Sequence, residues 1–199
     1  LGILIIVITG NEFTFRTFRQ HVVDGFSRIQ LLQGKAFMIL MIALYSLIMV
    51  LLFSLIFGFI FSSDYSNGAF IRKSYILLVY FIQAVSYMSL GFLLVIFFRN
   101  TALAIVLFIL YRLIIEPVLR LFFPVQARQY FPMKVIANLT PTPEFLSISS
   151  GNQQEDALSF REMGLVAEDL PVYLNLLLAM SYTVIFISLA YLLLRKRNL

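Results

Sequence analysis

The chain of 199 residues contains no cysteine, no tryptophan and a single histidine, His21. Without cysteine it can form neither disulfides nor a thiolate nucleophile, and with one histidine it cannot form a multi-histidine metal site. Charge is also scarce, because Asp, Glu, Lys and Arg make up 13% of the residues, whereas a soluble domain has roughly a quarter. These absences exclude a soluble globular fold and the common metal sites.

Catalytic and nucleotide-binding patterns are missing as well. His21 stands in a polar segment and the sequence has no glycine-flanked serine elbow, so no nucleophile, base and acid set can be assembled. The P-loop pattern is absent, because Gly34-Lys35 lacks the upstream glycine and the following hydroxyl. We therefore predict no catalytic residue, no metal ligand and no cofactor in this chain; any ATP and Mg would be bound by a separate subunit.

What the sequence has in abundance is apolar side chains, at 61% of residues, with a mean hydropathy of +0.93. Lipid forces the backbone to satisfy its own hydrogen bonds, and uncharged runs of more than about 20 residues without alternation select helices over a barrel. The predicted fold is an all-α integral membrane protein, a polytopic helical bundle in one domain over 1–199. The chain has a net charge of +5, and its basic residues are scattered at the span ends. This distribution indicates contact with lipid headgroups and not with nucleic acid.

Four complete spans are predicted, together with the end of a truncated one. Residues 1–9 cover roughly 14 Å, about half of a bilayer core, and are interpreted as that truncated end. Within the loop over 124–171, residues 127–139 are predicted as a short helical or re-entrant stretch interrupted by Pro132. Thr101 is the predicted cap of the third span. The spans are 36–61, 75–98, 102–123 and 172–194.

The distribution of Lys and Arg predicts the orientation. One face carries eight of these residues: Arg16, Arg19, Arg28, Lys35, Arg99, Arg195, Lys196 and Arg197. The other carries five: Arg72, Lys73, Arg128, Lys134 and Arg161. The first face is therefore predicted to be cytoplasmic, which places segment 11–35 and the C-terminus inside and loop 124–171 outside.

Segment 11–35 is polar but carries a helical pattern. Its apolar residues recur at steps of three and four, which predicts an amphipathic helix lying at the membrane surface. Gly25 is predicted to end this helix, and Gly34 to let the chain turn into the membrane at Lys35. The apolar stripe consists of Phe15, Phe18, Val22, Phe26 and Ile29.

The polar residues of this segment resemble those of the ABC-2 class of ABC transporter permeases. There, a Glu after a span precedes R-T-x-R, D-G-x-S-R and G-K elements, and the segment is a coupling helix that contacts a separate ATP-binding subunit. The resemblance implies ATPase coupling by Glu12, Arg16, Thr17, Arg19, Asp24 and Arg28, with Gly25, Ser27, Gly34 and Lys35 also matching. The alternative interpretation is an ordinary interfacial helix between two spans.

The resemblance also implies an overall plan. Members have six spans with both termini inside and extra structure outside between the fifth and sixth, and this chain fits from the late second span onward. It would be the permease subunit of an exporter in the bacterial cytoplasmic membrane, surrounded by lipid and paired with a second permease subunit and two ATPase subunits. A non-transporting scaffold or sensor, and less favourably an intramembrane enzyme, remain alternatives.

A cluster of three charged residues interrupts the third complete span. Arg112, Glu116 and Arg120 are spaced four and four on one helix face. Arg112 lies roughly 16 Å from the start of the span, near the bilayer centre, where an arginine costs about 2.5–3.5 kcal/mol without a partner. Glu116 is its predicted partner, and Pro117 is predicted to kink the helix beside the pair. Such a pair belongs either to a subunit interface or pathway, or is self-neutralising structure.

Overall fold

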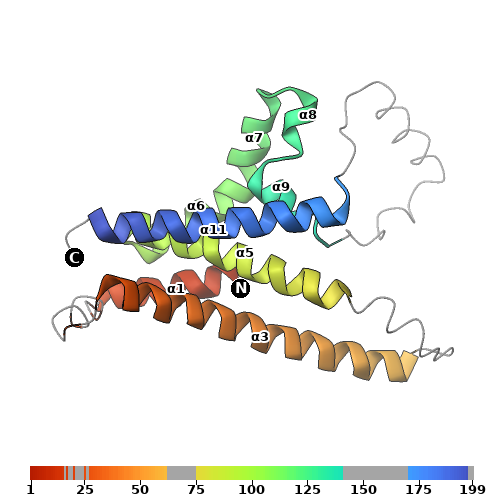
Figure 1. Cartoon of the computed structure of the whole chain (residues 1–199), viewed down its shortest axis with the longest axis horizontal. Helices are drawn as coiled ribbons and strands as arrows, with labels where there is room; N and C mark the ends of the chain where they lie inside the picture. The colour runs from red at the N-terminus through yellow and green to blue at the C-terminus, as the bar shows by residue number, and fades with distance from the viewer. Residues whose placement is uncertain are drawn as a thin grey trace.

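The computed structural model describes residues 1–15, 17, 20, 25, 27–61, 75–140 and 170–196. This part of the chain consists of helices joined by short turns and contains no strand. Figure 1 shows the helices α1 (Gly2–Thr14), α3 (Arg28–Phe61), α5 (Tyr75–Phe98), α6 (Thr101–Leu110), the π-helix η1 (Tyr111–Ile115), α7 (Glu116–Leu121), α8 (Val125–Arg128), α9 (Pro132–Ala137) and α11 (Val172–Lys196).

Within the described part of the chain, four helical stretches are long and apolar enough to cross a membrane, which confirms the all-helical, membrane-helix character predicted from composition. They are Ile29–Gly58, Tyr75–Phe98, Thr101–Leu121 and Val172–Lys196. α3, α5 and α11 run side by side along the long axis of the molecule (Figure 1). α5 is the central helix, since it packs against α1, α3, α6, α9 and α11.

Glycines allow α1 to approach α5 and α6 closely. A Cβ added at Gly91 of α5 would lie 2.7 Å from the carbonyl oxygen of Gly2, and one added at Gly10 would lie 2.2 Å from Thr101 Oγ1. Ile5 and Ile6 fill the same seam and are fully buried. Small residues at helix contacts are the usual means of close packing in membranes. Residues 1–9, which were predicted to be the end of a span, thus belong to the well-packed helix α1. This helix continues to Thr14, beyond the predicted end.

α3 begins at Arg28, eight residues before the predicted span, and continues without a break through Gly34 and Lys35. The predicted turn at Gly34 is therefore wrong. The physical reason is a capping box: the Gln30 side chain accepts from the Ser27 amide at 2.8 Å, and the Ser27 hydroxyl accepts from the Gln30 amide at 3.3 Å. With 34 residues, α3 is about 51 Å long and exceeds a bilayer core of about 30 Å.

The start of α6 also differs from its prediction. Asn100, rather than Thr101, caps α6, because its side chain accepts from the Leu103 amide at 3.2 Å. Arg99 immediately before it has a φ of 52°, in the left-handed region. This tight reversal returns the chain from α5 directly into α6.

The third complete span is not one straight helix. α6 packs against α1 and α5, but the chain then passes through the π-helix η1, in which the Glu116 amide donates to the carbonyl of Tyr111. Pro117 follows at the start of α7. A proline removes one helical hydrogen bond, and π-turns are common where the regular ladder is interrupted, so the predicted disturbance at Pro117 is present as a π-helix. α7 and α8 then project from the side of the bundle (Figure 1).

After α8 the chain returns to the bundle. Pro132 does not interrupt a helix as predicted; it occupies the first turn of α9, where its missing amide is harmless. The Tyr182 hydroxyl in the middle of α11 donates to the carbonyl of Tyr130, and Gln83 of α5 donates to the carbonyl of Ile136 at 2.9 Å. α9 is thus held between α5 and α11 instead of lying outside the bundle.

Candidate functional site

The two ends of segment 11–35 are joined by an ion pair. Lys35 Nζ of α3 donates to Glu12 Oε1 of α1. The two side chains are largely shielded, with exposed fractions of 13% for Lys35 and 24% for Glu12. The Thr17 hydroxyl donates to the Glu12 carbonyl at 3.2 Å, so three of the residues that carry the resemblance meet at one point.

This ion pair leaves one acceptor unused. Glu12 Oε2 is buried and has no hydrogen-bond partner within the described part of the chain. A shielded ion pair with an unused hydrogen-bond acceptor contributes less to folding stability than a fully hydrogen-bonded pair. Removing either partner is nevertheless unfavourable, because it leaves the other charge uncompensated. Its clear effect is geometric: it fixes the end of α1 against the start of α3, at the same end of the bundle as the end of α11 (Figure 1).

Only some of the other predicted coupling residues are among the residues that the structure describes. Arg16, Arg19 and Asp24 lie outside the described residues, and Arg28 is the first residue of α3. Gly25 has a φ of 92°, the left-handed conformation that suits a helix-ending glycine. Of the predicted apolar stripe, Phe15 is 72% and Ile29 51% exposed, while the middle three residues lie outside the described set.

Arg112 and Glu116 do not form the predicted ion pair. The Arg112 guanidinium lies 5.5 Å from the centre of the Tyr87 ring on α5, a cation–π contact. The ion pair found between described residues joins Lys35 and Glu12, not Arg112 and Glu116. The two residues diverge because both oxygens of Glu116 are engaged by the backbone amides of Met133 and Lys134.

Glu116 instead fixes the start of α9. Its side chain is fully buried, and its carboxyl oxygens accept from the backbone amides of Met133 at 2.9 Å and Lys134 at 2.8 Å. These amides belong to the first turn of α9. The amides of a first turn find no acceptor within their own helix, so they need one from elsewhere. The carboxyl group of one helix therefore caps another.

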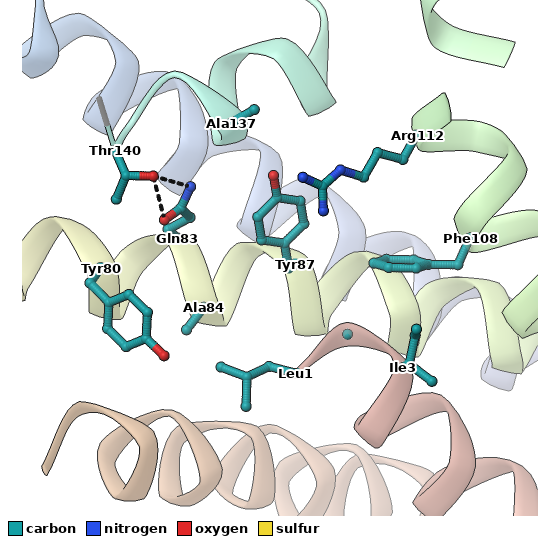
Figure 2. Close-up of a pocket in the computed structure, with 11 residues that line it drawn as sticks. Leu1, Ile3, Tyr80, Gln83, Ala84, Tyr87, Phe108, Arg112, Ala137 and Thr140 are labelled. Atoms are coloured by element: carbon teal, nitrogen blue, oxygen red, sulfur yellow. Dashed lines mark hydrogen bonds between the residues drawn. The ribbon is translucent and has the colours of Figure 1, made fainter. Parts of the chain in front are cut away.

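A cavity of about 450 Å³ opens beside Arg112. Figure 2 shows Arg112 and Tyr87 facing each other at one end and the hydrogen-bonded pair Gln83 and Thr140 at the other. α1 and α6 supply the apolar side, with Phe108 beside the guanidinium. The complete lining is Leu1, Gly2, Ile3, Tyr80, Gln83, Ala84, Tyr87, Phe108, Arg112, Ala137 and Thr140.

Sequence reasoning did not find the cap or the cavity. The Glu116 contact joins residues 17 and 18 positions apart in the sequence, and no local pattern encodes it. One signal was present: Pro132 marks a first helical turn, whose free amides need an acceptor. Tyr87 carried no signal, because an aromatic residue in an apolar run is ordinary.

In comparisons with known proteins, no protein-family model, curated protein or solved structure matches this chain. The family resemblance therefore rests on the residues of segment 11–35 and on the order of the spans.

Proposed function

We propose that the chain is the permease subunit of an ABC-2 type transporter that exports a substrate across the bacterial cytoplasmic membrane. ATP is hydrolysed in this proposal by a separate subunit that docks on segment 11–35. The working unit contains two permease subunits, as two copies or as a pair with a related chain, and two ATPase subunits.

The observation that carries the proposal is the ion pair between Glu12 and Lys35. A segment that transmits movement must be rigidly connected to the spans it moves, and a surface helix held by lipid alone needs no such connection. The ion pair supports this connection because it ties the segment at both ends, to α1 through Glu12 and to α3 through Lys35.

The packing of the helices gives secondary support. α1 meets α5 and α6 along a seam with glycine contacts, and α5 contacts every other long helix of the described chain. A displacement of the segment would therefore be passed through α1 into the central helix. The placement of α9 against α5 and α11 fits an outer element that dips into the membrane and caps a pathway.

The test is a charge-reversal series on the full chain, co-expressed with a candidate ATPase subunit from the same organism. We expect Glu12→Lys and Lys35→Glu each to weaken co-purification of the ATPase and the stimulation of its hydrolysis, and the double exchange to restore both, because it rebuilds the pair. Reversals at Arg19 and Asp24 should weaken docking without such rescue.

Lys196→Glu is the matched control, since Lys196 is an exposed cation at the same end of the bundle. It should leave co-purification near the wild-type level. Wild-type co-purification and hydrolysis in all the single reversals would refute the proposal and leave the segment as a membrane-surface helix.

A further inference from the structure

We propose that η1 is a switch with two hydrogen-bond registers. In the observed register it holds Glu116 on α9, and in a second, purely α-helical register Glu116 pairs with Arg112 and releases α9. The proposal concerns the conformations of this chain alone and does not rest on the transport function. It follows from the contacts of η1, α7 and α9, which all lie in the described part of the chain.

The π-helix explains why Arg112 and Glu116 point in different directions. In an unbroken α-helix, residues four apart share a face. In η1, however, the Glu116 amide donates to the carbonyl of Tyr111, five residues back. Such a turn holds one residue more than an α-turn, so α7 is rotated by about 100°, the angle of one residue, relative to an uninterrupted helix. Glu116 therefore faces α9, while Arg112 faces Tyr87.

Pro117 makes the second register accessible. On a change to the α register, the Glu116 amide would exchange the Tyr111 carbonyl for the Arg112 carbonyl. Pro117 has no amide, so the next position of the helix has no hydrogen bond to lose in either register. The proline ring also crowds the carbonyl of Leu113 in an α-helix, which favours the π-turn. The same proline thus stabilises the observed register and lowers the cost of leaving it.

Glu116 has a different set of partners in each register. In the observed register its oxygens accept from the amides of Met133 at 2.9 Å and Lys134 at 2.8 Å. In the second register the spacing of four would place it beside Arg112, and arginine forms strong charge-assisted hydrogen bonds with a carboxylate. The observed contact of Arg112, 5.5 Å from the centre of the Tyr87 ring, is of a weaker kind. A carboxyl group rotated away from α9 cannot cap it, so the two sets of contacts exclude each other.

α9 can be released at one end without unfolding. Its first turn depends on Glu116, whereas its far end is held by Gln83, which donates to the Ile136 carbonyl at 2.9 Å. The Tyr182 hydroxyl holds the chain just before α9 by donating to the Tyr130 carbonyl. Two packed arrangements with different contacts are the usual basis of a conformational switch. In the second register the start of α9 loses its acceptor and separates from α7.

The test measures the distance between spin labels on α7 and α11 in the full chain, reconstituted in lipid nanodiscs. α7 projects from the side of the bundle (Figure 1), so its rotation should be visible from α11. Leu121→Cys on α7 and Val184→Cys on α11 use exposed positions, and the 199 residues contain no cysteine of their own. We expect Pro117→Ala, which supplies the amide that the α register lacks, to add a second distance. A side chain about 5 Å from the axis of α7 would move by up to about 8 Å.

The next variant removes the competing partner of Glu116. Arg112→Gln in the Pro117→Ala background should restore the wild-type distance, because the second register then has no ion pair. Arg99→Gln is the matched control, since it removes an exposed cation before α6, and it should leave the second distance in place. The proposal is overturned by a single wild-type distance in Pro117→Ala, by a second distance that survives Arg112→Gln, or by equal reversal in Arg99→Gln.

A second measurement does not depend on the folding of Pro117→Ala. Amide hydrogen exchange across α9 would be compared between the unlabelled wild type and Arg112→Gln alone. The switch predicts slower exchange in Arg112→Gln, because the register that releases α9 has lost its ion pair. If Arg112 only supported packing, its removal would loosen this region and speed exchange. Equal or faster exchange in Arg112→Gln would therefore also overturn the proposal.

Discussion

Two of the long apolar helices, α5 and α3, look alike in sequence but occupy opposite environments. In α5, 50% of the most apolar stretch is buried, whereas in α3 the share is 11%. α5 is surrounded by five other helices, while α3 exposes large side chains such as Tyr45 at 62% and Phe53 at 58%. Hydropathy therefore identifies a span, but the partners of a helix decide whether it is a core element or faces lipid.

The largest expected effect comes from the carboxyl group that caps α9. Glu116→Ala would leave the buried amides of Met133 and Lys134 without an acceptor. Hydrogen bonds to charged groups contribute about 1.5–3 kcal/mol each, so we expect a loss of about 3–5 kcal/mol in the free energy of unfolding. The measurement is equilibrium unfolding of the full chain in mixed detergent and SDS micelles.

Glu116→Gln is the matched control for that variant. It keeps the shape of the side chain and one acceptor oxygen, so its loss should be clearly smaller than that of Glu116→Ala. Equal stability of Glu116→Ala and wild type would mean that α9 is not held by this contact.

The next effect compares a glycine on each of the two helices. Gly91→Ala on α5 would place a Cβ 2.7 Å from the Gly2 carbonyl oxygen, and overpacking of this kind costs about 1–3 kcal/mol. Gly58→Ala on α3 meets nothing within 4 Å and should stabilise the helix by about 0.5–1 kcal/mol. The opposite signs should appear as a lower and a higher melting temperature. A destabilised Gly58→Ala would show that α3 is packed as tightly as α5.

The smallest effect compares two serines. The Ser86 hydroxyl of α5 lies 2.9 Å from Thr183 Oγ1 of α11, whereas the Ser46 hydroxyl of α3 donates to the Ala43 carbonyl of its own helix at 2.8 Å. Interhelical hydrogen bonds in membranes contribute about 0.6 kcal/mol on average. Ser86→Ala should lose about that amount and Ser46→Ala close to none in the same unfolding assay. A larger loss for Ser46→Ala would reverse the assignment of inner and outer helices.

The span-length apolar helices were predictable because their signal is local. Uncharged runs longer than about 20 residues specify helices in lipid, and 75–98 matches α5 at both ends. The start of α3 is also encoded locally, because the capping box of Ser27 and Gln30 begins the helix before Gly34. The π-helix was signalled only indirectly, by Pro117.

The candidate sites were less predictable, for a different physical reason. The ion pair joins residues 23 positions apart, and the cavity combines side chains from α1, α5, α6, η1 and α9. Which partner Arg112 chooses depends on how these helices pack, and the spacing of four to Glu116 supplied a plausible but wrong partner. Spacing within one helix specifies a shared face, not the contacts that the face makes.

The most direct test of the central claim is a photo-crosslink from segment 11–35 to an ATPase subunit. A photoreactive amino acid would replace Gln20, which is helical and exposed, in cells that also produce a candidate ATPase subunit. Tyr45, exposed on α3 within a candidate span, is the control position. We predict a crosslink to the ATPase from position 20 and none from position 45. Absence of an ATPase crosslink at position 20, with the protein correctly inserted, would contradict the proposal that the chain is a transporter permease.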